Sequence, residues 1–169
     1  MWIIVDGYNL IRQWPELAML DRADLEAGRE ALLRELAAYR RARGHEITVV
    51  FDGRERGGVE GSPSRAAGVT VRYSRQGETA DEVIGRLAAE GREQAVVVSS
   101  DRAVMGEARR HGAACLSSAE FLDRLEASRI AAVKGGDEER DARPQKTGKG
   151  TAHRLPKAQR KLTRQLRGV

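Results

Sequence analysis

Four aspartates are the side chains of this sequence best suited to chemistry, because each lies close to the end of a short apolar run. They are Asp6, Asp52, Asp81 and Asp101. Carboxylates crowded together repel one another unless a cation neutralises them, and hard oxygen ligands of this kind suit Mg²⁺ or Mn²⁺. Such a site can hold a phosphodiester, deprotonate a water molecule and stabilise the leaving oxygen. The four acids therefore predict metal-dependent phosphodiester hydrolysis.

Polar residues beside these acids extend the predicted site. Glu78, which lies three residues before Asp81, is a further candidate metal ligand. Asn9 supplies a neutral amide that can orient a carboxylate or a bound water, and Ser99 and Ser100 can do the same. An aspartate after a strand is also common as a turn or helix-capping residue, so any one of these acids alone would be structural more often than catalytic. The catalytic interpretation depends on all of them reaching one place.

Alternating strand-like and helix-like segments supply the framework that would bring the acids together. Apolar or β-branched runs predict buried strands at 3–5, 47–51, 69–73, 95–98 and 113–116. Apolar residues at helical spacing predict helices between Asp21 and Gly44, before Gly91, over 101–111 and after Ser117. This order of elements predicts an α/β fold, a three-layer sandwich with a mainly parallel sheet.

The four aspartates occupy equivalent positions in this framework. Asp6, Asp52 and Asp101 follow the first, second and fourth predicted strands, and Asp81 lies in the first turn of the helix after the third. All four positions fall at the carboxyl edge of a parallel sheet, where ligands bind at the point at which the strand order reverses. Two capping-box pairs, Thr79 with Glu82 and Ser117 with Glu120, are expected to start helices next to this edge.

The charges of the chain are unevenly distributed. Residues 1–127 contain 18 Arg, no Lys and 21 Asp plus Glu, a net charge of −3. Residues 128–169 contain 12 Lys plus Arg against 4 acids, a net charge of +8. A basic segment of this kind indicates a polyanionic partner such as RNA, although a solvated tail that only aids solubility would show the same charge.

This asymmetry predicts three parts. They are a catalytic α/β domain over 1–127, a flexible linker over 128–152 and a basic amphipathic helix over 153–169. The predicted RNA contacts of the basic segment are Arg143, Lys146, Lys149, Arg154, Lys157, Arg160, Lys161, Arg164 and Arg167.

Further RNA contacts are predicted within the first part. The segment 53–68 is rich in Gly, Arg, Ser and Pro and is expected to be a long mobile loop. Its arginines, and two at the end of the third strand, are candidates for holding phosphates, and one tyrosine near the edge is a candidate for stacking on bases. These residues are Arg54, Arg56, Arg65, Arg72, Arg75 and Tyr8.

The rest of the composition excludes several classes of protein. Cys115 is the only cysteine, so an internal disulfide and a multi-cysteine zinc site are excluded. The three histidines are too scattered for a zinc site. The N-terminal apolar run stops at Asp6, so neither a signal peptide nor a membrane span is visible. A cytoplasmic protein without a membrane role is expected.

Four motifs resemble one known family. Asp6-Gly7-Tyr8-Asn9, Phe51-Asp52-Gly53, Glu78-Thr79-Ala80-Asp81 and Ser99-Ser100-Asp101 occur in the order of the NYN domain. The resemblance is closest to its YacP-like bacterial branch, within the PIN-like nuclease superfamily, and it covers about residues 1–127. A basic C-terminal helix is also similar to that branch. The interval 53–68 departs from the pattern, since it contains no family landmark.

The resemblance implies a parallel α/β sandwich with divalent-metal endoribonuclease activity. The four aspartates match the acidic positions of the family, and Asn9 matches its asparagine. The sequence thus predicts hydrolysis of RNA, either free or within a large ribonucleoprotein such as the ribosome. One alternative is a catalytically silent RNA-binding module of the same fold. Another is a phosphatase or receiver-like domain, which the absence of Lys from residues 1–127 disfavours.

Overall fold

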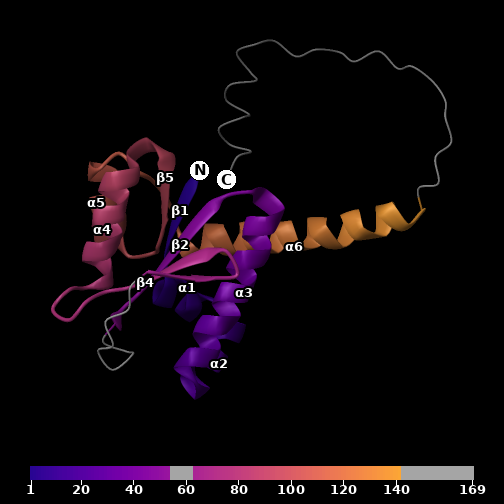
Figure 1. Ribbon diagram of the computed structural model, residues 1–169, viewed down its shortest axis with the longest axis horizontal. Helices are drawn as coiled ribbons and strands as arrows, with labels where there is room; N and C mark the ends of the chain where they lie inside the picture. Colours follow the sequence, from indigo (N-terminus) through magenta and orange to yellow (C-terminus); the bar gives the residue numbers. More distant parts are fainter. Residues whose placement is uncertain (54–62, 142–169) are drawn as a thin grey trace, which may run out of the picture.

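A six-stranded sheet lies at the centre of the part of the chain that the computed structural model describes, residues 1–53 and 63–141 (Figure 1). Its strands are β1 (Trp2–Asp6), β2 (Glu46–Phe51), β3 (Ser64–Ala66), β4 (Val69–Tyr73), β5 (Ala95–Val98) and β6 (Ala114–Leu116). Their order in the sheet is β3-β4-β2-β1-β5-β6. Every neighbouring pair is parallel except β3 and β4, so the predicted mainly parallel sheet is confirmed.

Helices cover both faces of the sheet. They are α1 (Gly7–Gln13), α2 (Pro15–Ala23), α3 (Leu25–Arg43), α4 (Ala80–Gly91), α5 (Arg102–Arg110) and α6 (Ser118–Asp141), with a short 3-10 turn η2 (Arg92–Gln94). Figure 1 shows α4 and α5 together on one side of the strands and α3 and α6 on the other. Two apolar layers result, since alternate residues of β1 pack into opposite layers: Ile3 and Val5 into one, Ile4 into the other. The three-layer sandwich is therefore confirmed.

The order of the strands reverses next to β1. From β1 the chain continues to β2 and β4 on one side, and then crosses through α4 to β5 on the other side of β1. The carboxyl ends of β1 and β5 are therefore neighbours at the reversal, which is where α/β sheets bind their ligands. Asp6 is the last residue of β1, and Ser99 follows β5 directly.

The segment 53–68 differs from the expected loop. Residues 64–66 form β3, which pairs antiparallel with β4 through a tight turn at Ala67 and Gly68, both with positive φ. The turn needs these two backbone conformations, and glycine adopts one readily. The residues of β3, Ser-Arg-Ala, carry no apolar alternation, which is why the sequence pattern does not predict this strand. Residues 54–62, which include Arg54 and Arg56, lie outside the described part of the chain.

The last helix is longer than the sequence predicts. The pattern indicates a helix through Leu125 and a linker from residue 128, but α6 continues to Asp141. Residues 128–141 are therefore helical, and the expectation of a linker there is wrong. Strong helix formers such as Ala131 and Ala132 continue the helix, and no proline follows before Pro144. The predicted basic helix over 153–169 lies outside the described residues. No helix of the described part is long and apolar enough to cross a membrane.

Candidate active site

Asp6 is fixed at the end of β1 by two hydrogen bonds. Its Oδ1 accepts from the backbone N–H of Asn9 at 3.3 Å, which caps the N-terminus of α1. Its Oδ2 accepts from the hydroxyl of Ser99 at 2.9 Å. Burial raises the pKa of Asp6, the two hydrogen bonds oppose this rise, and the charges of Asp81 and Asp101 add to it. A half-buried carboxylate with two acidic neighbours is therefore held in one orientation.

Asp101 is tied to Asp6 through the same serine. The backbone N–H of Asp101 donates to the Ser99 hydroxyl at 3.1 Å, while that hydroxyl donates to Asp6. The Oδ1 of Asp101 caps α5 by accepting from the backbone N–H groups of Ala103 and Val104, at 2.7 Å and 3.3 Å. Ser99 is fully buried, so one hydroxyl fixes the relative position of two of the predicted catalytic acids.

A second buried serine holds Asp52 in a similar way. The hydroxyl of Ser74, which follows β4, donates to Asp52 Oδ1 at 3.3 Å and accepts from the backbone N–H of Gly53 at 2.9 Å. The two loops approach so closely that a Cβ added at Gly53 would lie 2.1 Å from the carbonyl oxygen of Ser74. Only glycine fits there, which accounts for one residue of the Phe51-Asp52-Gly53 motif.

Asp81 reaches the same edge from the first turn of α4. This turn starts with the predicted capping box, in which Thr79 Oγ1 accepts from the Glu82 N–H at 3.2 Å and Glu82 Oε2 accepts from the Thr79 N–H at 2.7 Å. Burial raises the pKa of Asp81, and the charges of Asp101, Asp52 and Glu82 raise it further. The structure thus brings the four aspartates close enough for their charges to act on one another.

The spacing of these acids is that of an open site. Within residues 1–53 and 63–141, no three His, Cys, Asp or Glu side chains are grouped closely enough to hold a metal ion by themselves. Magnesium sites commonly use one or two protein carboxylates and complete the shell with water and substrate phosphate. The donor chemistry fits such an ion, because a cation would offset the repulsion that raises the pKa values of Asp6 and Asp81.

Asn9 joins three elements rather than contacting a carboxylate with its side chain. Its Oδ1 accepts from the backbone N–H of Ser100 at 2.9 Å and from the hydroxyl of Ser118 at 2.7 Å. It thereby ties α1 to the start of α5 and to the first residue of α6. Sequence reasoning does not identify Ser118, and no local pattern could have found it, because 109 positions separate the two residues.

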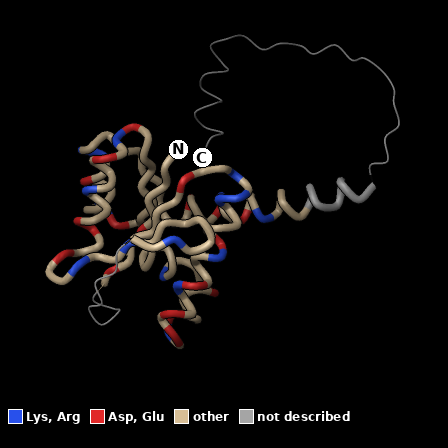
Figure 2. The backbone as a smooth tube through the Cα atoms, in the orientation of Figure 1, with Lys and Arg blue, Asp and Glu red and all other residues tan. Residues whose placement is uncertain are grey.

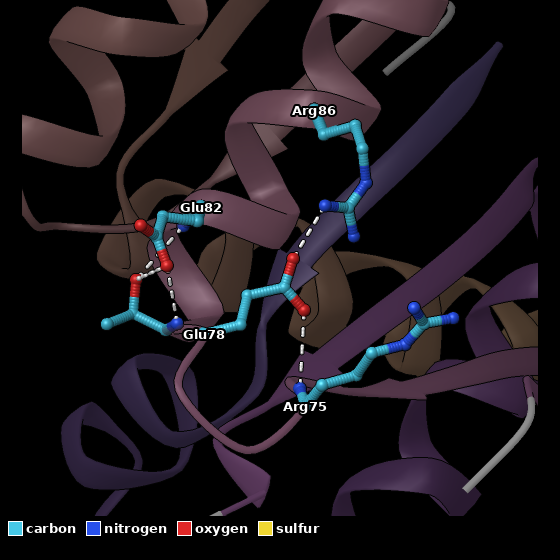
Figure 3. A network of polar contacts seen from close by, with 5 residues as sticks. Arg75, Glu78, Glu82 and Arg86 are labelled. Carbon is cyan, nitrogen blue, oxygen red and sulfur yellow. Dashed lines mark hydrogen bonds and ion pairs between the residues drawn. The ribbon is translucent and has the colours of Figure 1, made fainter. Parts of the chain in front are cut away.

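Glu78 has partners other than the aspartates (Figure 3). Its Oε1 accepts from Arg86 Nη1 at 2.6 Å, and its Oε2 accepts from the backbone N–H of Arg75 at 3.2 Å. The hydrogen bond from Arg86 is the main cause that lowers the pKa of Glu78. Glu78, a predicted metal ligand, thus forms an ion pair with Arg86. This ion pair would have to break before the carboxylate could bind a metal ion.

The predicted base-stacking role of Tyr8 is wrong. Its side chain is buried, its ring packs edge-on against Phe51 with centroids 5.1 Å apart, and its hydroxyl accepts from Arg29 Nη1 at 2.8 Å. Helix α1 begins directly after β1, so its second residue turns toward the core. Among the predicted phosphate contacts, Arg65 is exposed on β3. The nine basic residues of the tail lie outside the described residues, and their role stays a prediction.

Known proteins share this sequence pattern and this fold. The sequence profile of the YacP-like NYN domain family matches residues 3–167. An uncharacterized protein of Bacillus subtilis (strain 168), YacP, is 37% identical over 86 residues, which make up 51% of this chain and 50% of that protein. The alignment thus spans about half the length of this curated relative.

Two crystal structures of Rae1 (YacP) from Bacillus subtilis are also similar. A single-residue mutant has a TM-score of 0.72 and 28% identity, and the alignment covers 86% of either chain. The second structure has a TM-score of 0.70 and 30% identity over 82% of this chain and 80% of that one. Nuclease or RNA-related function follows at the level of the superfamily. The chain belongs to the YacP-like NYN domain family, a branch of the PIN-like nucleases.

Proposed function

We propose that this protein is a divalent-metal-dependent endoribonuclease. The observation that carries the proposal is the arrangement of the aspartates at the strand reversal, where Ser99 joins Asp6 to Asp101 and Ser74 holds Asp52. Asp6 and Asp81 both have raised pKa values, caused first by burial and then by the charges of neighbouring aspartates. Acids that perturb one another in this way are typical of functional sites. Membership of a nuclease superfamily agrees with this interpretation.

The aspartates would share the work of holding Mg²⁺ or Mn²⁺. When bound, such an ion activates a water molecule and stabilises charge on the scissile phosphate. The contribution of the chain itself is positional. The hydroxyl of Ser99 orients the Asp6 carboxylate and accepts a hydrogen bond from the backbone N–H of Asp101. The hydroxyl of Ser74 orients the Asp52 carboxylate. Asn9 fixes the positions of α1, the start of α5 and the start of α6 relative to one another.

The basic tail would supply much of the affinity for RNA. From Ala142 onward the sequence contains nine basic residues and no acid. In the rest of the chain both signs of charge are mixed over the helices (Figure 2). Neutralising backbone phosphates with Lys and Arg is the main source of non-specific affinity for nucleic acids. The tail therefore complements a domain whose acidic edge repels the substrate in the absence of metal.

The direct test is incubation of purified protein with RNA in the presence of Mn²⁺, Mg²⁺ or EDTA. We expect cleavage with the ions, none with EDTA, and none from Asp6→Asn or Asp101→Asn. Asparagine keeps the helix-capping oxygen, so both variants should fold. Asp123→Asn, an exposed change of the same type on α6, is the matched control and should cleave normally. RNA binding without any metal-dependent cleavage would instead favour a catalytically silent RNA-binding module.

A further inference from the structure

Three of the six residues that line a pocket next to the acidic edge are arginines. It lies between the end of β4 and the first turns of α4 and has a volume of about 610 Å³. Its lining residues are Arg72, Arg75, Gln76, Gly77, Glu78 and Arg86. Figure 3 shows the side chains of Arg75 and Arg86 on the same side of the Glu78 carboxylate.

Arg72 places part of a charged side chain inside the protein. It pairs with Val50 in the sheet, and Val50 packs into the layer of α4 and α5, so Arg72 is on the face of the sheet that α4 covers. Its Nε is buried and has no hydrogen-bond partner among the described residues. A buried donor without a partner is costly, and the cost is larger when the group is charged. Arg72 also lines the pocket, so an anion bound there would neutralise the charge of its guanidinium group and offset part of this cost.

The charges of the pocket do not balance. Glu78 is the only acid in its lining, and this carboxylate is engaged by Arg86 Nη1 at 2.6 Å and by the backbone N–H of Arg75 at 3.2 Å. Three guanidinium groups against one carboxylate leave an excess of two positive charges. Guanidinium groups bind phosphate with a fork of parallel hydrogen bonds, which makes phosphate a better match than a simple anion.

The pocket is also connected to the acidic edge. Ser74, the residue before Arg75, donates to Asp52 at 3.3 Å, and Asp81 follows Glu78 by three residues at the start of α4. A strand of RNA whose scissile phosphate lies at the aspartates carries its next phosphates to either side. The pocket lies on one of these sides, and its charge is opposite to theirs.

We propose that the pocket of Arg72, Arg75 and Arg86 binds a backbone phosphate of the RNA strand, adjacent to the phosphate that lies at the aspartates. The inference rests on the proposed function for its substrate, but it concerns binding and not hydrolysis. It assigns to the folded domain a phosphate contact of its own, separate from the basic tail, and it places the path of the strand on the α4 side of the sheet edge.

The test is the affinity of the full chain for a short single-stranded RNA in EDTA, measured over a range of salt concentrations. The double variant Arg72→Gln/Arg75→Gln should bind several-fold more weakly. The slope of log K against log salt should fall by about 0.7 for each phosphate that the variant no longer neutralises. The matched control is Arg34→Gln/Arg41→Gln, which removes two exposed charges from α3 and should leave affinity nearly unchanged.

Three further measurements exclude simpler explanations. Arg72→Lys should retain most of the salt slope but bind more weakly, because lysine keeps the charge and not the fork. Thermal unfolding should show that the double variant is folded, with an unfolding temperature close to that of the wild type, so that weaker binding does not result from unfolding. RNA with a 5′-phosphate and RNA with a 5′-hydroxyl should bind equally, as expected of a backbone contact.

The outcomes separate this inference from the proposed function. If the double variant binds RNA as tightly as the wild type and with the same salt slope, the inference is wrong even when the protein cleaves RNA. A requirement for the terminal phosphate would also overturn it. If the wild type does not cleave RNA with any of the metal ions but the double variant binds RNA more weakly as expected, phosphate binding by the pocket is supported and the nuclease proposal is wrong.

Discussion

Asp6 and Asp81 have raised pKa values for the same first reason, burial, but their surroundings differ. Asp6 accepts hydrogen bonds from Ser99 and Asn9, and these oppose the shift. For Asp81 every cause acts in the same direction, because burial is followed only by the charges of three neighbouring acids. At the scale of single residues, the site therefore contains repulsion that a bound cation would relieve.

Asp81→Asn should raise the unfolding temperature at neutral pH. The folded state raises the pKa of Asp81, so ionisation of this group favours the unfolded chain. The gain in stability over the wild type should be full at pH values above the raised pKa of Asp81. It should vanish as the pH falls from there to the ordinary pKa of 3.8, because the wild-type carboxyl is then protonated and carries no charge. Thermal melts across this range test the sign, with Asp123→Asn as the control. A variant less stable than the wild type at neutral pH would contradict the repulsion.

Ser99→Ala should reduce both stability and cleavage while leaving RNA binding in EDTA intact. The change removes the donor to Asp6 and leaves the backbone N–H of Asp101 without its acceptor. A buried group deprived of its partner costs about 1 to 3 kcal/mol of unfolding free energy. Denaturant melts and single-turnover cleavage measure the two effects. Normal cleavage by a destabilised variant would show that Ser99 supports the fold and not the positions of the acids.

At the scale of elements, five of the six strands were predictable from the sequence, whereas β3 and several connections were not. Parallel strands covered on both faces have continuous apolar runs, so β1, β2, β4, β5 and β6 could be found. The left-handed residue that ends α3 at Gly44 was also predictable, since glycine favours this position. Helices α1 and α2 were not predicted from apolar spacing, because they are short and their burial depends on contacts with α3.

The same limit applies to the candidate site. The edge that carries the four aspartates was predictable from the alternation of strands and helices, since three of the acids end or follow strands and Asp81 lies in the first turn of the helix after one. The serines that fix them act across the sheet: Ser99 was a candidate from its motif, but its bond to Asp6 bridges 93 positions. The burial of Tyr8 was not visible either, because it follows from the angle at which α1 leaves β1.

Gly53→Ala should destabilise the protein and impair cleavage. The new Cβ would collide with the carbonyl oxygen of Ser74, 2.1 Å away, and would force the ends of β2 and β4 apart. Asp52 would move with them. The control is Gly106→Ala within α5, where nothing lies within 4 Å of the added Cβ and the unfolding free energy should rise by about 0.5 to 1 kcal/mol. Equal melting temperatures for Gly53→Ala and the wild type would show that the loops can adjust.

At the scale of the whole molecule, the four aspartates and the largest excess of positive charge lie in different parts of the chain. The acids belong to the α/β domain formed by the elements from β1 to α6. The excess positive charge belongs to the segment after α6, which contains nine basic residues and no acid. The end of α6 at Asp141 is a better boundary between the two parts than residue 127, because α6 continues unbroken past that residue.

A chain that ends at Asp141 should still cleave RNA but should bind it more weakly. It lacks all nine basic residues that follow Ala142, and its salt slope should be lower by about 0.7 for each phosphate that they neutralise. Affinity and cleavage measured at low and moderate salt test both statements. If the shortened protein keeps the affinity and salt slope of the full chain, the tail is a solubility device.

The hydrogen bonds of Asp6 and Asn9 also determine when the site can exist. During synthesis Asp6 precedes its partner Ser99 by 93 positions, and Asn9 precedes Ser118 by 109. A nascent chain therefore carries no assembled site until the start of α6 has left the ribosome, by which time every strand of the sheet has been made. Under the proposed function, this long separation would keep the nuclease site incomplete until almost the whole α/β domain has been synthesised.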